Sequence, residues 1–386
     1  MPFFLRTRRL DLALVGALIL SACDRDDAKP APPPGPTTAE HKAAPPPPAP
    51  LPPPSGLPVV PHEGDDDDTG PDFVPPGSPI IPLRTIDLAV YLKAPAPPAL
   101  VADVADKVHA RFPSVALLKK PSPTPPPTVV VVSPDLDELP VPSADELSRF
   151  GRDLTPAQVE TAQGSKGAIV FSWLLDADPT YAELRKAETL VYEVAQKNGG
   201  FLWDDTTREL FSPDSWKKAR LDGWQGEIPD ARRHFTTHYY ESATELGRRH
   251  RAVTLGLAKL GLPDLVVEDL PPPLWGAMKV LLDAIAQGLV EGAPLLAEGK
   301  LTIDLKALHH AAAKGAFVAA AGPNATFRGH VSLGIVDPEE GDADNRLAEV
   351  RFDGYPGQTE PERQAAGLRA ILGDVAAVPS SKPPKP

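Results

Sequence analysis

The sequence contains a single cysteine, Cys23, among its 386 residues. One cysteine cannot form an internal disulfide, so any folded part has to be stabilised by its apolar core alone. The chain also has only two methionines, and aromatic residues make up 6% of it. No uninterrupted apolar run reaches the ~20 residues that a helix needs to cross a bilayer. We therefore predict no membrane-spanning helix.

Positive charge is the next deficit. The chain has 39 Lys and Arg residues against 52 Asp and Glu residues, which gives a formal net charge of −13. Nucleic acids and anionic lipid surfaces both favour clustered Lys and Arg. The composition therefore predicts no nucleic-acid partner.

Catalytic and cofactor motifs are missing as well. The chain has no Gly-x-Ser-x-Gly nucleophile motif. The segment Gly164-Ser-Lys-Gly167 is too short for a phosphate-binding loop and lacks its strand–loop–helix setting. We therefore predict no cofactor and favour a function without catalysis.

The first 23 residues carry the most specific pattern. Arg6, Arg8 and Arg9 precede an apolar run from Leu12 to Leu20, which is typical of a secretion signal. The run ends in Leu20-Ser-Ala-Cys23, which resembles the lipobox of bacterial lipoproteins. That resemblance implies that residues 1–22 are removed and that Cys23 is acylated. It also implies a bacterial cell-envelope location on the inner or outer membrane, with the globular part outside the cytoplasm.

A proline-rich linker follows, predicted for residues 23–83. Of the 50 prolines in the chain, 20 fall between Asp24 and Leu83, and several stand in consecutive runs. Such runs favour extended polyproline II and cannot fold into a core. The linker is predicted to be disordered. Its reach is at most roughly 190 Å at ~3.1 Å per residue.

The pattern of residues 84–224 predicts an α+β domain. Strand–helix–strand units are expected at 84–118 and 167–204. Two such units facing each other form a ferredoxin-like sandwich, with helices on one face of an antiparallel sheet. The residues between the units would then be an insertion.

Three cap signals accompany the helices of this region. Ser143, with Glu146 three residues later, is expected to form a capping box at the start of a short helix. Asp178 and Pro179 are expected to begin the helix of the second unit, and Asn198-Gly-Gly200 is expected to end it.

Residues 225–378 are predicted to form a second α+β region, followed by a disordered tail at 379–386. Strands are expected at 234–241, 252–257 and 264–269, and a hairpin at 326–336 and 347–352. Helices are expected after the proline run at 271–273 and at 360–372.

Four residues are weak candidates for chemistry. His234 and His238 stand four apart, and Glu241 follows Tyr239 and Tyr240. A zinc site would need a third ligand, and the residue after His234 is Phe235 rather than the glutamate of a metalloprotease helix. Asp204 and its neighbour Asp205 follow a predicted strand, where an acidic pair either caps a turn or acts in acid–base catalysis. No metal site is assigned.

Three functions remain open on the sequence. The first is a membrane-anchored, non-enzymatic module that binds or scaffolds an unknown envelope protein. The second is an envelope hydrolase, with or without a metal, around His234 and His238. The third is a small-ligand module with a tryptophan-lined pocket. Trp275 follows three prolines at a predicted helix start, where it either lines a groove for a partner or, as we favour, packs in the core.

Overall fold

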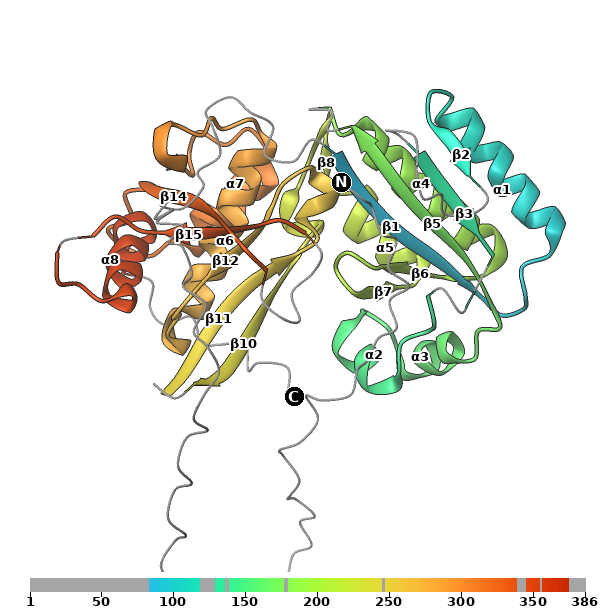
Figure 1. Cartoon of the computed structure of the whole chain (residues 1–386), viewed down its shortest axis with the longest axis horizontal. Coiled ribbons are helices and arrows are strands. Elements are labelled where there is room, and N and C mark those ends of the chain that lie inside the picture. Colours follow the sequence, from blue (N-terminus) through green and yellow to red (C-terminus); the bar gives the residue numbers. More distant parts are fainter. Residues whose placement is uncertain are drawn as a thin grey trace, which may run out of the picture. The chain divides into compact units, whose positions relative to one another are not determined.

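The computed structural model describes residues 83–118, 129–134, 136, 139–176, 180–244, 247–338, 345–354 and 356–374 (Figure 1). The predictions for the signal segment, Cys23, nearly all of the linker and the tail therefore lie outside the described residues. Within them the fold is α+β, as predicted, with a seven-stranded, a six-stranded and a two-stranded sheet.

The seven-stranded sheet contains both predicted strand–helix–strand units. In sheet order its strands are β2 (Ala116–Leu118), β3 (Val129–Ser133), β5 (Gly167–Asp176), β1 (Leu83–Leu92), β6 (Phe201–Asp204), β7 (Glu209–Phe211) and β4 (Gly151–Arg152).

The central strands of this sheet have the ferredoxin-like order. β1 pairs antiparallel with both β5 and β6, and β3 pairs antiparallel with β5. The helices α1 (Pro98–Arg111) and α4 (Ala182–Asn198) contact each other and share one core with these strands. One detail differs from the predicted unit. β2 lies outside β3 and runs parallel to it, because the apolar run of β3 occupies the place beside β5.

Apolar side chains point to both faces of the seven-stranded sheet along β1, so both faces have to be covered. Ile86, Leu88 and Val90 pack in the core that contains α1 and α4, whereas Ala89 and Tyr91 pack in a separate cluster on the opposite face. That cluster includes residues of α2 (Ala144–Phe150) and α3 (Pro156–Gln163). The predicted insertion therefore covers the second face.

Two helix ends test the predicted caps. Ser143 and Glu146 form the expected capping box at the start of α2. α4 begins at Ala182, after Tyr181 in a left-handed conformation, and the predicted caps Asp178 and Pro179 lie outside the described residues. The predicted end of α4 is confirmed, since Gly199 adopts the left-handed φ of 65° that glycine tolerates.

The six-stranded sheet lies in the second predicted region. In sheet order its strands are β10 (Thr236–Thr244), β11 (Gly247–Leu255), β12 (Asp264–Val267), β15 (Leu347–Arg351), β14 (Arg328–Val336) and β13 (Lys300–Asp304). The predicted hairpin is confirmed as the antiparallel pair of β14 and β15. The helices of this region are α6 (Trp275–Val290), α7 (Ala311–Ala320) and α8 (Glu360–Leu372).

Short elements connect the two large sheets. They are α5 (Pro213–Trp216), the π-helix η1 (Lys217–Leu221), the hairpin of β8 (Trp224–Gln225) and β9 (Ile228–Pro229), and the 3₁₀ helix η2 (Ala231–Arg233). Further 3₁₀ helices are η3 (Leu257–Leu260), η4 (Pro272–Leu274) and η5 (Ala297–Gly299). Core residues from both sheets form one continuous apolar cluster. No helix of the described part is both long and apolar enough to cross a membrane. The division at residues 224 and 225 stays a prediction.

Candidate functional site

The four candidate residues occupy three different environments. Asp204, at the end of β6, and His234, just before β10, are completely buried. His238 lies half-buried on β10, and Glu241 is exposed on the same strand. His238 follows His234 by four residues, but each ring contacts different partners. The structure does not bring the four residues together.

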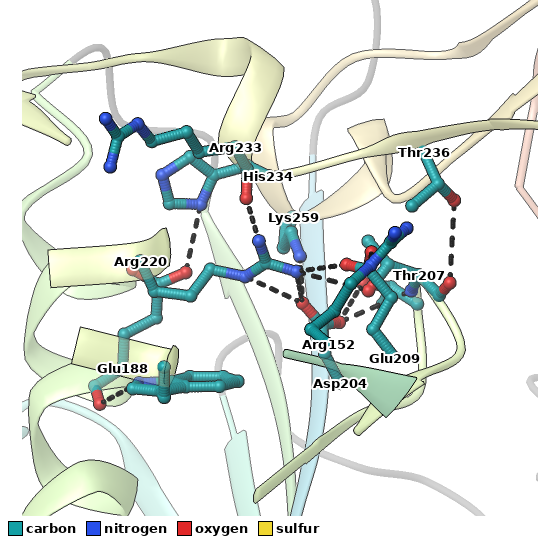
Figure 2. A network of polar contacts seen from close by, with 12 residues as sticks. Arg152, Glu188, Asp204, Thr207, Glu209, Arg220, Arg233, His234, Thr236 and Lys259 are labelled. Atoms are coloured by element: carbon teal, nitrogen blue, oxygen red, sulfur yellow. Dashed lines mark hydrogen bonds and ion pairs between the residues drawn. The ribbon is translucent and has the colours of Figure 1, made fainter. Parts of the chain in front are cut away.

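Asp204 is the centre of a buried ion network, which we define as Asp204, Glu209, Arg220 and Lys259 (Figure 2). Arg220 donates from Nε and Nη2 to Asp204 Oδ2, at 3.2 and 2.9 Å, and from Nη2 to Glu209 Oε2 at 2.7 Å. Lys259 Nζ donates to the same oxygen of Asp204. Each of the four side chains is at most 5% exposed.

The local fold explains how these side chains converge. Asp204 ends β6 and Glu209 begins β7, so the tight turn between them places both carboxylates at the same end of a hairpin. Arg220 comes from η1 and Lys259 from η3, which follows β11. The ion network therefore joins the seven-stranded sheet to the connection that follows the second strand of the six-stranded sheet.

Gly256, next to η3, is required by this close approach. Its φ is +114°, and a Cβ at this position would lie 2.5 Å from Cγ2 of Thr207 and 2.7 Å from the carbonyl oxygen of His234. A larger residue would push η3, and Lys259 with it, away from the turn of Asp204.

Charge pairing outweighs burial at Asp204. Burial alone would raise the pKa of this carboxyl, but the positive charges of Lys259 and Arg220 lower it well below its usual range. For Lys259 the order is reversed, because burial lowers the pKa of the ammonium more than Asp204 raises it. Asp204 is thus a firmly ionised counter-ion rather than an acid–base group.

Glu188 and His234 form a second buried pair beside the ion network. Glu188 lies on α4, and its Oε1 is 3.0 Å from Nδ1 of His234. The indole of Trp224 meets the His234 ring edge-on at 5.8 Å, and the Trp216 indole donates to the Glu188 carbonyl oxygen. Both side chains are enclosed, at 1% and 0% exposure, so neither is open to a substrate in this structure.

His238 lies in a different place, against the insertion. Its ring is 5.9 Å from Phe150, at the end of α2, and 6.3 Å from the ring of Tyr240. Burial first, and then the charges of Arg208 and Arg152 against the opposing charge of Glu209, lower the pKa of His238 to about 4. His238 is therefore neutral at physiological pH.

Asp264 on β12 is a buried carboxyl with the opposite shift. It accepts hydrogen bonds from Thr254 Oγ1 and the Leu257 amide, both at 3.1 Å, and from Asn345 Nδ2 at 2.7 Å. Burial outweighs these bonds and raises the pKa of Asp264 to about 6.

His238 and Asp264 are expected to change the free energy of unfolding in opposite directions as the pH falls. Between pH 6.5 and about 4, His238 binds a proton in the unfolded chain but not in the folded chain. Acidification over this range therefore lowers the free energy of unfolding by ~3 kcal/mol. At Asp264 the folded chain binds the proton first, so acidification from pH 6 to 4 raises that free energy by a similar amount. Relative to the unaltered protein, we expect His238→Asn to gain stability and Asp264→Asn to lose it as pH falls from 6.5 to 4. Urea denaturation at four pH values measures both, and curves parallel to that of the unaltered protein would contradict the assignment.

The described residues contain no group of three or more His, Cys, Asp or Glu residues that could hold a metal ion. They do contain a surface groove of about 610 Å³, between the end of α1, the first turns of α4 and the β8–β9 hairpin. Its wall includes Arg111, Arg185, Lys186 and Trp224. None of the four candidate residues lines it.

Sequence reasoning missed most of the ion network. Arg220, Glu209 and Lys259 are 16, 5 and 55 positions from Asp204, and ordinary charged residues at such spacings carry no motif. One local signal was available. Lys259 stands in the run Leu257-Ala-Lys-Leu260 between Gly256 and Gly261, and a lone lysine in an apolar turn is a candidate for burial with a counter-ion.

Comparisons with family models, with curated proteins and with solved structures found no match to this chain.

Proposed function

We propose that this protein is a bacterial envelope lipoprotein, held to a membrane through acylated Cys23, and that its globular part binds or scaffolds another envelope component without catalysis. The anchor rests on the lipobox-like segment Leu20-Ser-Ala-Cys23. The proposed lack of catalysis rests on Asp204 and His234, which are buried against charged partners.

The ion network is the observation that carries this proposal. A general acid or base has to reach its substrate and have a pKa near the working pH. Asp204 meets neither condition, because it is enclosed and paired with two cations. Such a cluster supports a role in joining the two sheets, where its charges compensate one another.

A hydrolase around His234 and His238 has less support. His234 is enclosed with Glu188, while His238 faces Phe150 and Tyr240. A hydrolytic mechanism needs a base and a second polar group converging on one reactive atom. No such convergence of the two histidines exists among the described residues.

The groove beside Trp224 favours a small-ligand module as the second candidate. Its volume lies within the roughly 300–1,000 Å³ range of ligand pockets. The Arg185 guanidinium lies over the Trp224 ring, with 5.3 Å between Cζ and the ring centre, and donates to the Gly226 carbonyl oxygen. Trp275 does not line this groove and stacks on Tyr239 at 4.7 Å.

The non-enzymatic proposal predicts that substitution of the accessible candidate residues is harmless. We expect the double variant His238→Gln/Glu241→Gln to restore the phenotype of a gene-deletion strain as fully as the unaltered protein, since neither residue belongs to the ion network. The measurement is complementation at matched protein level, confirmed by immunoblot. Because both residues lie on β10, loss of complementation would revive the hydrolase only for a variant that is present, folded and unaltered in the peptide binding described for β10 below. Arg185→Ala in the same assay tests the groove. Loss of complementation by this variant, with the double variant unaffected, would favour the small-ligand module.

A further inference from the structure

β10 is the outermost strand of the six-stranded sheet and pairs with β11 on one side. That pairing runs along all nine residues, from Thr236 opposite Leu255 to Thr244 opposite Gly247. β12 pairs with β11 at Ala252 and Val253. On an outermost strand, alternate backbone N–H and C=O groups point away from the sheet.

The other sheet edges in the described residues are protected in ways that β10 is not. β2 and β4, at the edges of the seven-stranded sheet, have three and two residues, and β8 and β9 of the two-stranded sheet have two each. β13 has five, begins with Lys300 and is bridged by the segment before it through Leu295 and Leu301. β10 has the sequence Thr-Thr-His-Tyr-Tyr-Glu-Ser-Ala-Thr, rich in strand-forming residues and without proline or lysine. It is therefore the edge best suited to receive another strand.

The two faces beside this edge differ in chemistry. On one face, Tyr239 stacks on Trp275 and donates to its carbonyl oxygen, so a partly buried aromatic pair lies beside the strand. On the other face, His238 lies between the rings of Phe150 and Tyr240. Tyr240 is 39% exposed, although large apolar side chains are usually covered in this fold.

The second face carries positive charge from Arg208 and Arg152, which we call the cationic margin. Arg208 and Arg152 both act electrostatically on His238. Arg152 pairs with Glu209 yet remains 46% exposed. Arg208, held in the β6–β7 turn with a φ of 56°, forms no ion pair within the described part of the chain. In a protein of net charge −13, this cationic margin marks a place for an acidic partner.

We propose that the outer edge of β10 binds an extended segment of another envelope protein, in which acidic and apolar residues alternate, as an additional strand of the sheet. Strand addition supplies main-chain hydrogen bonds, while alternate side chains read the two faces. Acidic side chains would then face Arg208 and Arg152, and apolar ones would face Tyr239 and Trp275. This inference rests on the proposed binding function and names the class of partner.

The test uses the purified full chain and a capped octapeptide of alternating Val and Glu. We expect saturable binding with a dissociation constant below about 1 mM and slower amide hydrogen exchange in residues 236–244. The same peptide with Lys in place of Glu should bind at least about tenfold more weakly, because it carries the wrong charge. A peptide of four Val followed by four Glu should lose affinity similarly, because its charges no longer lie on one face.

Two variants separate this site from general charge attraction. Arg208→Glu should weaken binding about tenfold or more. Arg369→Glu, on the exposed side of α8, makes the same charge change elsewhere and should leave binding unaltered. Equal binding of the Glu and Lys peptides, protection of a segment other than β10, or no binding at 1 mM peptide would each overturn the proposal. The complementation test uses no peptide, so such a failure would leave the broader function standing.

Discussion

Asp204→Asn should lower the free energy of unfolding by about 3–5 kcal/mol, because it leaves buried cations without their shared counter-ion. Lys259 has Asp204 as its ion-pair partner, and Arg220 directs two donors to the same carboxylate oxygen. Asparagine is nearly the same size, so the loss reports charge rather than packing. Urea denaturation at pH 7, followed by tryptophan fluorescence, measures it, because Trp216 lies under the Arg220 guanidinium.

A double-mutant cycle shows whether the charges act as a unit. Lys259→Met removes one buried cation, so Asp204→Asn/Lys259→Met should cost less than the sum of the two single changes. Asp222→Asn is the matched control, because Asp222 pairs with Lys217 where both side chains are about half exposed. That control should cost at most about 1 kcal/mol. Additive losses within the network would show that its charges act independently. An equal loss in the control would show that the network contributes no more than a surface pair.

The periodic segments of the fold were predictable, because their signals are local. The alternation at 84–92, the apolar run at 167–175 and the capping box of α2 each depend on neighbouring residues, and each appears in the structure. The place of β2 was not predictable, because two apolar segments, at 116–118 and 129–133, competed for the position beside β5. Their order depends on strand length and burial in the assembled sheet.

The site was less predictable than the fold, for a physical reason. His234 and His238 were paired because their spacing gives one face of a strand, but β10 begins at Thr236, so His234 belongs to the preceding turn and is buried. Asp204 was recognised as a carboxylate at a strand end, yet its role depends on Lys259, 55 residues later. Contacts between distant segments are set by tertiary packing and have no characteristic spacing in the sequence.

The ion network and the edge of β10 meet at one turn. Glu209 of the ion network pairs with Arg152, and Arg208 directly precedes Glu209 in the chain. A change in the network at this turn would therefore also move the cationic margin of β10. For that reason the charge reversal in the binding test is placed at Arg208, which lies outside the network.

Cys23→Ser is expected to have the largest effect on location. An acylated cysteine carries more than one acyl chain, which gives stable rather than marginal membrane binding, and serine accepts none by this route. We expect the protein to shift from almost wholly membrane-bound to almost wholly soluble, or to persist as an unprocessed precursor that retains residues 1–22. Fractionation with an alkaline wash, followed by intact-mass analysis, distinguishes these species.

The matched control for the anchor is Ser78→Ala, a change of similar size within the predicted linker and outside the lipobox-like segment. It should leave the protein in the membrane fraction with the mass of acylated Cys23. An unaltered protein with an unmodified thiol at Cys23, or a serine variant that resists the alkaline wash, would contradict the lipid anchor. In that case the globular part would have to reach its partner without a membrane tether, and the edge of β10 would be tested as the site of a freely diffusing protein.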